Sequence, residues 1–271
     1  MNTPQSYHLL AAALDGATEP PGGLFAWSVR SAVRGLVAHA DYLRRSQRAR
    51  RLRRGDRPLE ARLRELARLD ANPMARLVRP ARDDAAFRLG WNRYNRLAPL
   101  GVDTQLQAPG PALQRQARAG IADDGFRRDT VAACIAALRD AAAQALPSSL
   151  AESARSLGDA AGDTLAEALA LLRQQPEADL VASAAALGCR PRTLQRRFTQ
   201  AGLSFNLLRQ ATRIELAGEL LRQPAPPSLT EVAQAAGFFD SAHFGHAWRQ
   251  SCGLAPGDYR DIATAMRAAT P

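Results

Sequence analysis

The sequence predicts an all-α protein with a helical N-terminal domain, 1–175, and a C-terminal domain, 176–271, built from two helix-turn-helix units and a long connecting helix. Alanine, leucine and arginine recur at helical spacing, whereas runs of alternating β-branched residues are scarce. The 271 residues exceed the length of most single domains. The segment "RQQP" ends a helical pattern, so Pro176 is the predicted domain boundary.

The excess positive charge is carried entirely by arginine. The chain has 36 basic residues, none of them lysine, against 26 acidic ones, and a net charge of +10. Residues 1–175 hold 26 arginines against 18 acids, and residues 176–271 hold 10 against 8. Guanidinium groups bind phosphates in a bidentate manner. The composition therefore permits nucleic-acid binding without establishing it.

Several classes of protein are disfavoured. No apolar run approaches the ~20 residues that a membrane span requires, and the first 20 residues lack the cationic start of a signal peptide. Cys134, Cys189 and Cys252 are scattered, which favours a reducing compartment over a disulfide framework. His243, His246 and Cys252 have a spacing that could bind a metal, but no fourth ligand is near. We expect a cytoplasmic protein with no membrane contact, metal or cofactor.

The N-terminal part shows four amphipathic helical patterns. The first carries Trp27 to Leu43 and runs into the arginines of Arg44 to Arg54, and the second carries Leu59 to Leu69. The others cover 128–145 and 149–173. The last pattern, interrupted by glycines, is either a core helix or a surface that pairs two protomers into a homodimer.

Two further uses of the N-terminal part remain open. Trp27, Trp91 and Tyr94 could line a pocket for a small-molecule effector, or could simply pack in the core. The segment "RRSQRARRLRR" could contact DNA phosphates, or could form a solvated or acid-paired helix face beside Asp41, Asp56 and Glu60. The arginines of this segment that we assign as accessory phosphate contacts are Arg50, Arg51, Arg53 and Arg54.

The stretch "GCRPRTLQRRF" joins two helices in the C-terminal part. Gly188 suits the left-handed end of a short apolar helix over 181–187, and Pro191 suits the first position of the next helix. Leu194 and Phe198 are four residues apart and face inward. This arrangement is a helix-turn-helix whose second helix, ending near Gln200, has the chemistry for a major groove.

The polar residues of this second helix divide into two roles. An arginine fork can grip guanine and a glutamine can pair with adenine, so Arg192, Gln195 and Arg196 are candidate base readers. Arg190 and Arg197 point to the flanks and would contact phosphates. The alternative is a solvated, arginine-rich helix face.

A second unit repeats the plan in "SLTEVAQAAGFFDSAHFGHAWRQSCGLAPGDYR". A short alanine-rich helix is followed by Gly237 and by a helix with Phe244 and Trp248 inward. The segment "SFNLLRQATRIELAGELL" between the units predicts one long helix. Two reading helices on a rigid connector could enter successive major grooves, about 34 Å apart.

Residues 176–262 resemble the AraC/XylS family of bacterial transcription regulators. The resemblance rests on "RTLQRRF", the connector, the "GFF" turn and the closing G-x-x-P-x-x-Y-R from Gly253 to Arg260. It implies transcription regulation through contacts with promoter DNA and RNA polymerase. The small β-barrel sensor common in that family is not indicated in 1–175.

Carried over by position, the resemblance also implies DNA contacts from the second unit. The residues are Ser241, Ala242, His243, His246 and Arg249. The family usually has serine at Ala242, arginine at His246, phenylalanine at Trp248 and a capping serine at Arg190. An imidazole ordinarily titrates near pH 6.5, so it lacks the permanent charge of arginine. We therefore predict that the second unit binds DNA more weakly than the first.

The alternative reading is an enzyme with a catalytic helical N-terminal domain and an appended helix-turn-helix. The sequence offers no paired nucleophile and base, no Gly-rich phosphate loop and no HExxH motif. His8 and His39 are the only histidines before Pro176, and Cys134 in "AACIAAL" is typical of a core position. We expect no enzymatic activity.

Overall fold

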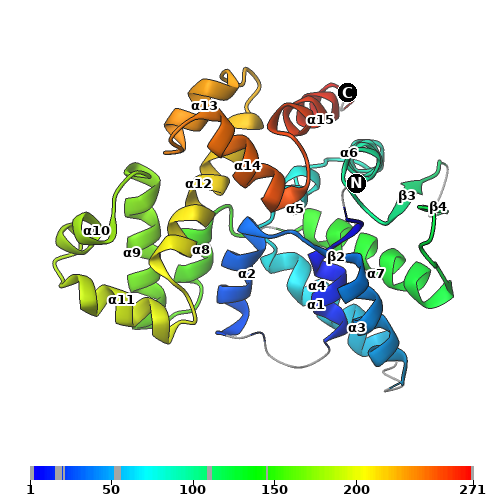
Figure 1. Cartoon of the computed structure of the whole chain (residues 1–271), viewed down its shortest axis with the longest axis horizontal. Helices are drawn as coiled ribbons and strands as arrows, with labels where there is room; N and C mark the ends of the chain where they lie inside the picture. The colour runs from blue at the N-terminus through cyan, green and yellow to red at the C-terminus, as the bar shows by residue number, and fades with distance from the viewer. Residues whose placement is uncertain are drawn as a thin grey trace.

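The computed structural model of the chain describes residues 3–15, 20, 22–51, 56–108, 112–144 and 146–269. Helices dominate these residues, which confirms the all-α prediction (Figure 1). The strands form two small antiparallel sheets. β1 (Gln5–Tyr7) pairs with β2 (Leu36–Ala38) with Gln5 opposite Ala38, and β3 (Val102–Leu106) pairs with β4 (Leu113–Ala117) with Val102 opposite Ala117.

Seven helices precede residue 145 in the described part of the chain. They are α1 (His8–Leu14), α2 (Gly23–Val33), α3 (His39–Arg51), α4 (Asp56–Leu69), α5 (Pro73–Val78), α6 (Asp84–Leu97) and α7 (Gly125–Ala142).

The prediction of a single helix from Trp27 into the arginine segment is wrong. The segment breaks into α2, β2 and α3. At the break, the Gly35 N–H donates to the Ser251 carbonyl oxygen at 2.6 Å. A Cβ on Gly35 would stand 2.1 Å from the Asn72 side-chain nitrogen, so only glycine fits there.

The helix predicted over 149–173 is also two helices, α8 (Leu150–Arg155) and α9 (Ala160–Gln174). Gly158 between them has a φ of +71°, which ends the first helix. The Asp159 carboxylate accepts a hydrogen bond from the Gly162 N–H at 2.7 Å and starts the second. Leu165, Leu169 and Leu172 of α9 are buried within this chain, so the predicted stripe is used in the core.

The C-terminal part contains the predicted units. α10 (Leu180–Ala186) and α11 (Pro191–Gln200) form the first unit, α12 (Phe205–Leu221) is the connector, and α13 (Leu229–Ala235) and α14 (Ser241–Cys252) form the second. α15 (Pro256–Ala268) closes the domain against α6.

Two hydrophobic clusters hold the molecule together, and both mix the two predicted domains. In one, Phe25 and Val29 of α2 pack with Leu208 of α12 and the first unit. In the other, Tyr94 of α6 packs with Trp248 of α14 and the second unit. The C-terminal domain is therefore docked on the N-terminal part over both units. Helix α9 precedes Pro176 but packs on α12 of the C-terminal domain. The domain boundary at Pro176 stays a prediction.

Among the residues that the structure describes, no helix has the length and apolar character needed to cross a bilayer.

Candidate nucleic-acid interface

The first unit is built as its sequence predicts. Gly188 has a φ of +63°, and the Cys189 N–H donates to the Ala184 carbonyl oxygen at 2.9 Å, so the chain leaves α10 in a tight left-handed turn. Leu194 and Phe198 are fully buried and anchor α11. Arg190 stands at the N-cap without a side-chain capping bond, as predicted from the loss of serine.

The anchoring of α11 exposes the opposite face of the helix. The predicted contact residues Arg190, Arg192, Gln195, Arg196 and Arg197 are all exposed. Their order on a helix with Leu194 and Phe198 inward presents an arginine-rich face to solvent. That face carries no acidic residue, because α11 contains none.

The second unit repeats this geometry. Gly237 has a φ of +75°, and the Phe238 N–H donates to the Ala233 carbonyl oxygen at 2.9 Å, which is the same turn as in the first unit. Phe244 and Trp248 are buried and anchor α14. The exposed residues of α14 include the predicted contacts Ser241, Ala242, His243, His246 and Arg249.

The start of α14 differs from the start of α11. The Asp240 carboxylate accepts a hydrogen bond from the His243 N–H at 2.7 Å and caps the helix. A carboxylate at a helix N-terminus satisfies the positive end of the helix dipole. α14 therefore offers less attraction to a phosphate at its start than α11 does.

The turn of the second unit is fixed against the connector α12 and against Pro176, which lies just before the first unit. The Arg213 Nε of α12 donates to the Pro176 carbonyl oxygen at 2.8 Å, and the Arg213 guanidinium lies 6.0 Å from the centroid of the Phe238 ring. Gly237 packs directly on Pro176, because a Cβ there would stand 2.7 Å from the proline Cβ. A hollow of about 250 Å³ lies beside these contacts, lined in part by Arg209, Arg213 and His243.

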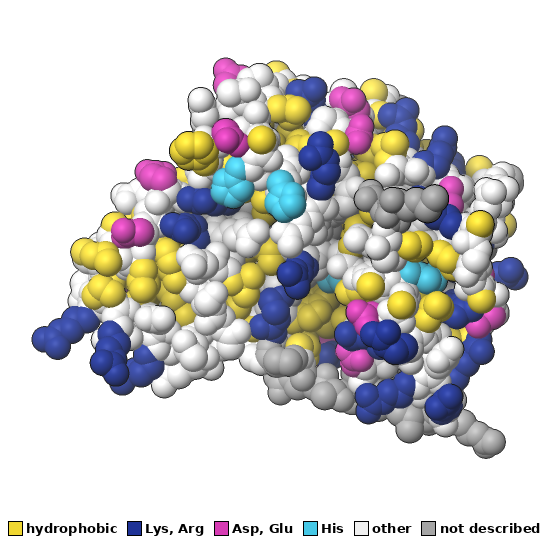
Figure 2. All heavy atoms as spheres, in the orientation of Figure 1, with side chains coloured by type: hydrophobic (Ala, Val, Ile, Leu, Met, Phe, Trp, Pro, Cys, Tyr) yellow, Lys and Arg dark blue, Asp and Glu magenta, His cyan; other side chains and the backbone are white. Residues whose placement is uncertain are grey.

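Sequence reasoning missed the part that α2 plays at this surface. Gly22, just before α2, packs on Gly202 in the α11–α12 turn, and Arg30 Nη1 from the last turn of α2 donates to the Gly202 carbonyl oxygen at 3.1 Å. The end of α2 meets α14, where Ser251 Oγ donates to the Ala32 carbonyl oxygen at 2.6 Å. Arg34, directly after α2, is exposed. Figure 2 shows arginine side chains over α2 on the same face as the histidines of α14.

The arginine segment of α3 is partly neutralised. Arg44 pairs with Asp41, and Arg45 pairs with Asp15. Arg50 pairs with Asp124 at 2.6 Å. Arg51 is exposed, whereas Arg53 and Arg54 lie outside the described residues. α3 lies at the opposite end of the molecule from α11 (Figure 1), and the accessory phosphate contacts stay a prediction.

The metal-binding alternative at the second unit is wrong in its geometry. Cys252 is fully buried, with its thiol 3.7 Å from the Trp248 carbonyl oxygen, whereas His243 and His246 are exposed. Within the described part of the chain, no group of three or more His, Cys, Asp or Glu side chains is placed to hold a metal ion. The burial of Cys252 follows from its position on the inward face of α14.

Of the three aromatic residues that could line an effector pocket, two lie at a cavity, and the binding of an effector stays a prediction. Trp91 and Tyr94 line a cavity in the N-terminal part, together with residues that sequence reasoning did not single out. Trp27 is not among the lining residues. Its ring stacks on His8, with centroids 5.4 Å apart.

Comparison with known proteins places the C-terminal geometry in a family. A family model described as a helix-turn-helix domain matches residues 183–262, which hold both units and the connector. Residues 183–262 form an AraC-type helix-turn-helix domain. The AraC-type domain makes this chain a DNA-binding transcription regulator.

Solved structures with similar folds are distant. A DNA-binding transcriptional dual regulator from Escherichia coli K-12 is 18% identical with a TM-score of 0.36, over 38% of this chain and 93% of that one. ToxT from Vibrio cholerae strain SCE256, bound to an unsaturated fatty acid, is 17% identical with a TM-score of 0.34, over 37% of this chain and 36% of that one. Another ToxT structure from Vibrio cholerae is 12% identical with a TM-score of 0.33, over 66% and 68%. No curated protein matches this chain.

Proposed function

We propose that the AraC-type domain reads two successive major grooves of promoter DNA, α11 in one and α14 in the next. The observation that carries the proposal is the rigid connection of the two units. They share α12 and meet at Gly237 and Pro176, and their predicted contact faces are both exposed. A fixed spacing between two reading helices is what binding to one face of DNA requires.

Within this proposal the first unit supplies most of the affinity. Arg192, Gln195 and Arg196 read base edges, and the uncapped start of α11 favours a phosphate near Arg190. The second unit is weaker because Asp240 already caps α14 and His246 lacks a permanent charge. Arg34, next to α2, supplies a phosphate contact between the two units.

The wider role follows from the resemblance to the AraC/XylS family. We infer that the regulator acts on chromosomal DNA in the cytoplasm, that it contacts RNA polymerase, and that it performs no chemistry of its own. The N-terminal part serves in this view as a sensor for a small molecule. We also propose a homodimer. The apolar face of α9 does not form its interface, because that face is buried inside the chain.

The test is selection of genomic DNA fragments by the full chain, with Arg196→Ala and Arg155→Ala compared on the recovered sites. Arg155 is an exposed arginine of α8 and is the matched control. We expect a motif with two elements about one helical turn apart. Arg196→Ala should lose about 1–3 kcal/mol and relax the preference at one position of the motif. Arg155→Ala should leave affinity and motif unchanged.

The salt dependence tests Arg34 separately. Arg34→Gln should weaken binding uniformly across sequences and reduce the slope of log affinity against log salt by about 1.

A recovered motif that Arg196→Ala leaves intact would show that α11 does not read the bases.

A further inference from the structure

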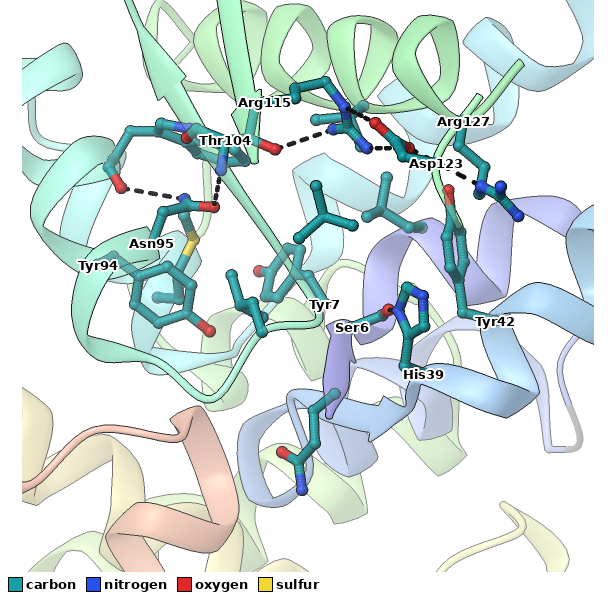
Figure 3. Close-up of a pocket in the computed structure, with 17 residues that line it drawn as sticks. Ser6, Tyr7, His39, Tyr42, Tyr94, Asn95, Thr104, Arg115, Asp123 and Arg127 are labelled. Carbon is teal, nitrogen blue, oxygen red and sulfur yellow. Dashed lines mark hydrogen bonds and ion pairs between the residues drawn. The ribbon is translucent and has the colours of Figure 1, made fainter. Parts of the chain in front are cut away.

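A partly open cavity lies in the N-terminal part, away from the DNA-binding helices. Its volume is about 40 Å³, and its walls come from β1, α3, α6, β3, β4 and α7 (Figure 3). One water molecule needs roughly 10–15 Å³ of such space. The cavity therefore holds about three waters, or a ligand of about four non-hydrogen atoms.

Four buried polar atoms in the cavity wall have no hydrogen-bond partner within the described part of the chain. They are His39 Nε2, the Tyr42 hydroxyl, the Tyr94 hydroxyl and Arg127 Nε. These four residues are between 1% and 6% exposed. An unpaired buried polar group costs about 1–3 kcal/mol, so four beside one cavity indicate that something absent from the protein chain satisfies them.

Three of the four lie on one side of the cavity. Figure 3 shows His39, Tyr42 and Arg127 together, with Tyr94 on the other side. His39 Nδ1 is already 2.8 Å from Ser6 Oγ, which fixes the ring. Tyrosine O–H and arginine N–H groups are donors, so the unpaired groups call for a ligand rich in acceptors.

The charges around this side favour an anion. Arg115 and Asp123 form two hydrogen bonds, at 2.7 and 2.8 Å, and their charges neutralise each other. Arg127 pairs with Asp124 through Nη2 at 2.9 Å, and its Nε, which makes no hydrogen bond within the described residues, lies 3.8 Å from Asp123 Oδ1. The charged groups on this side, counted with their ion-pair partners, are Arg50, Arg115 and Arg127 against Asp123 and Asp124, with one positive charge in excess. Burial, followed by the charge of Arg127, lowers the pKa of His39, which keeps its imidazole neutral and able to donate or accept.

We propose that this cavity binds a small monocarboxylate of the size of acetate or propionate. The Tyr42 hydroxyl and Arg127 Nε donate to the carboxylate, and His39 Nε2 completes its shell. The short hydrocarbon part lies against the apolar wall, which includes Leu10, Leu100 and Val131. Charge-assisted hydrogen bonds of this kind are the stronger ones in proteins, and they replace bonds that the empty site lacks.

The ligand binds the N-terminal part whether or not α11 and α14 read DNA as proposed, so the two proposals fail separately. The experiment is isothermal titration calorimetry of the full chain with sodium acetate and sodium propionate, with sodium chloride at matched ionic strength as the blank. Sodium nitrate, a planar oxyanion without a hydrocarbon part, is the comparison ligand. The variants are Tyr42→Phe and Arg127→Gln. Tyr259→Phe is the control for loss of a buried hydroxyl outside the cavity; because that hydroxyl bonds Arg222 and the Pro73 carbonyl oxygen, its binding is measured at a temperature where the variant is folded.

Saturable binding of acetate or propionate is expected, together with a Tm that rises with ligand concentration. Tyr42→Phe should fold normally, because the hydroxyl it removes has no partner among the described residues, and should weaken binding at least tenfold. Arg127→Gln should also weaken binding, with a loss of stability because its ion pair with Asp124 is removed. Tyr259→Phe should bind as the wild type does. Absence of binding by the wild type, or undiminished binding by Tyr42→Phe, would overturn the proposal. Nitrate that binds as tightly as either carboxylate would overturn the assignment to an organic acid.

Discussion

His39 gives the protein a pH dependence of folding stability. Burial, with the charge of Arg127, lowers the pKa of His39; Arg115 adds to this effect and Asp123 opposes it. The unfolded chain takes up the proton near pH 6.5, above the pKa in the folded state. The stability is therefore fully present above about pH 6.5 and is lost as the pH falls from there through the lowered folded value. Urea unfolding measured above and below pH 6.5 should show this loss of stability. In His39→Gln, the free energy of unfolding should depend less on pH.

A second residue-scale prediction concerns His246, which is exposed on α14. His246→Arg adds a permanent charge to the reading face of the weaker unit. It should tighten DNA binding and steepen the salt slope by about 1. Fluorescence anisotropy with labelled promoter DNA, compared with His246→Gln, measures both. Equal affinities of the arginine, glutamine and wild-type proteins would mean that this side chain faces only solvent.

At the scale of elements, the two turns of the helix-turn-helix units offer a matched pair. Gly188 and Gly237 both have positive φ, but only Gly237 is crowded, by Pro176. Alanine at either position costs about 1–2 kcal/mol of backbone strain. Gly237→Ala should also displace α14 relative to α11, and so weaken binding to DNA that carries both elements. Gly188→Ala should keep its affinity once the stability loss is allowed for. Urea unfolding and DNA titration of both variants test this, and equal affinities would contradict the rigid spacing of the units.

The same elements show what the sequence could predict. α10, α11, α13 and α14 were predictable because their end glycines, inward aromatic residues and capping positions are all local. The break between α8 and α9 has a local cause in Gly158, whose positive φ interrupts the predicted helix. The break at Gly35 was not predictable, because its causes are Asn72 and Ser251, which are distant in the sequence.

At the scale of the molecule, the two candidate sites also differ in whether their residues are close together or far apart in the sequence. The DNA-binding residues lie within two short stretches, so the sequence alone placed them on exposed faces. The cavity brings together β1, α3, α6 and α7, and only Trp91 and Tyr94 suggested it beforehand. His39, Tyr42 and Arg127 meet only because the chain folds back over about 90 residues, and nothing local marks them as partners.

A chain of buried hydrogen bonds connects that cavity to the second reading helix. Tyr7 lines the cavity, and its hydroxyl donates to Asp70 Oδ2 at 2.5 Å. Asp70 Oδ1 accepts from the Asn72 N–H at 3.0 Å, and Asn72 Nδ2 donates to the Ser251 carbonyl oxygen at 3.0 Å, near the end of α14. We expect a carboxylate in the cavity to change DNA affinity through this route.

Asn72→Ser tests the route and keeps the cap of α5. Serine can still accept from the Met74 N–H, as the Asn72 side chain does at 3.0 Å, but it removes the donor to the carbonyl oxygens of Ser251 and Ser31. In the wild type, DNA should change the affinity for acetate by about 5- to 150-fold. Acetate should change the affinity for DNA by the same factor, because coupling between two sites is reciprocal. Asn72→Ser should bind acetate alone as tightly as the wild type and lose the coupling. If Asn72→Ser keeps the full factor, occupancy of the cavity reaches α14 by another path, and the contact between Asn72 and Ser251 serves only to hold the two parts of the molecule together.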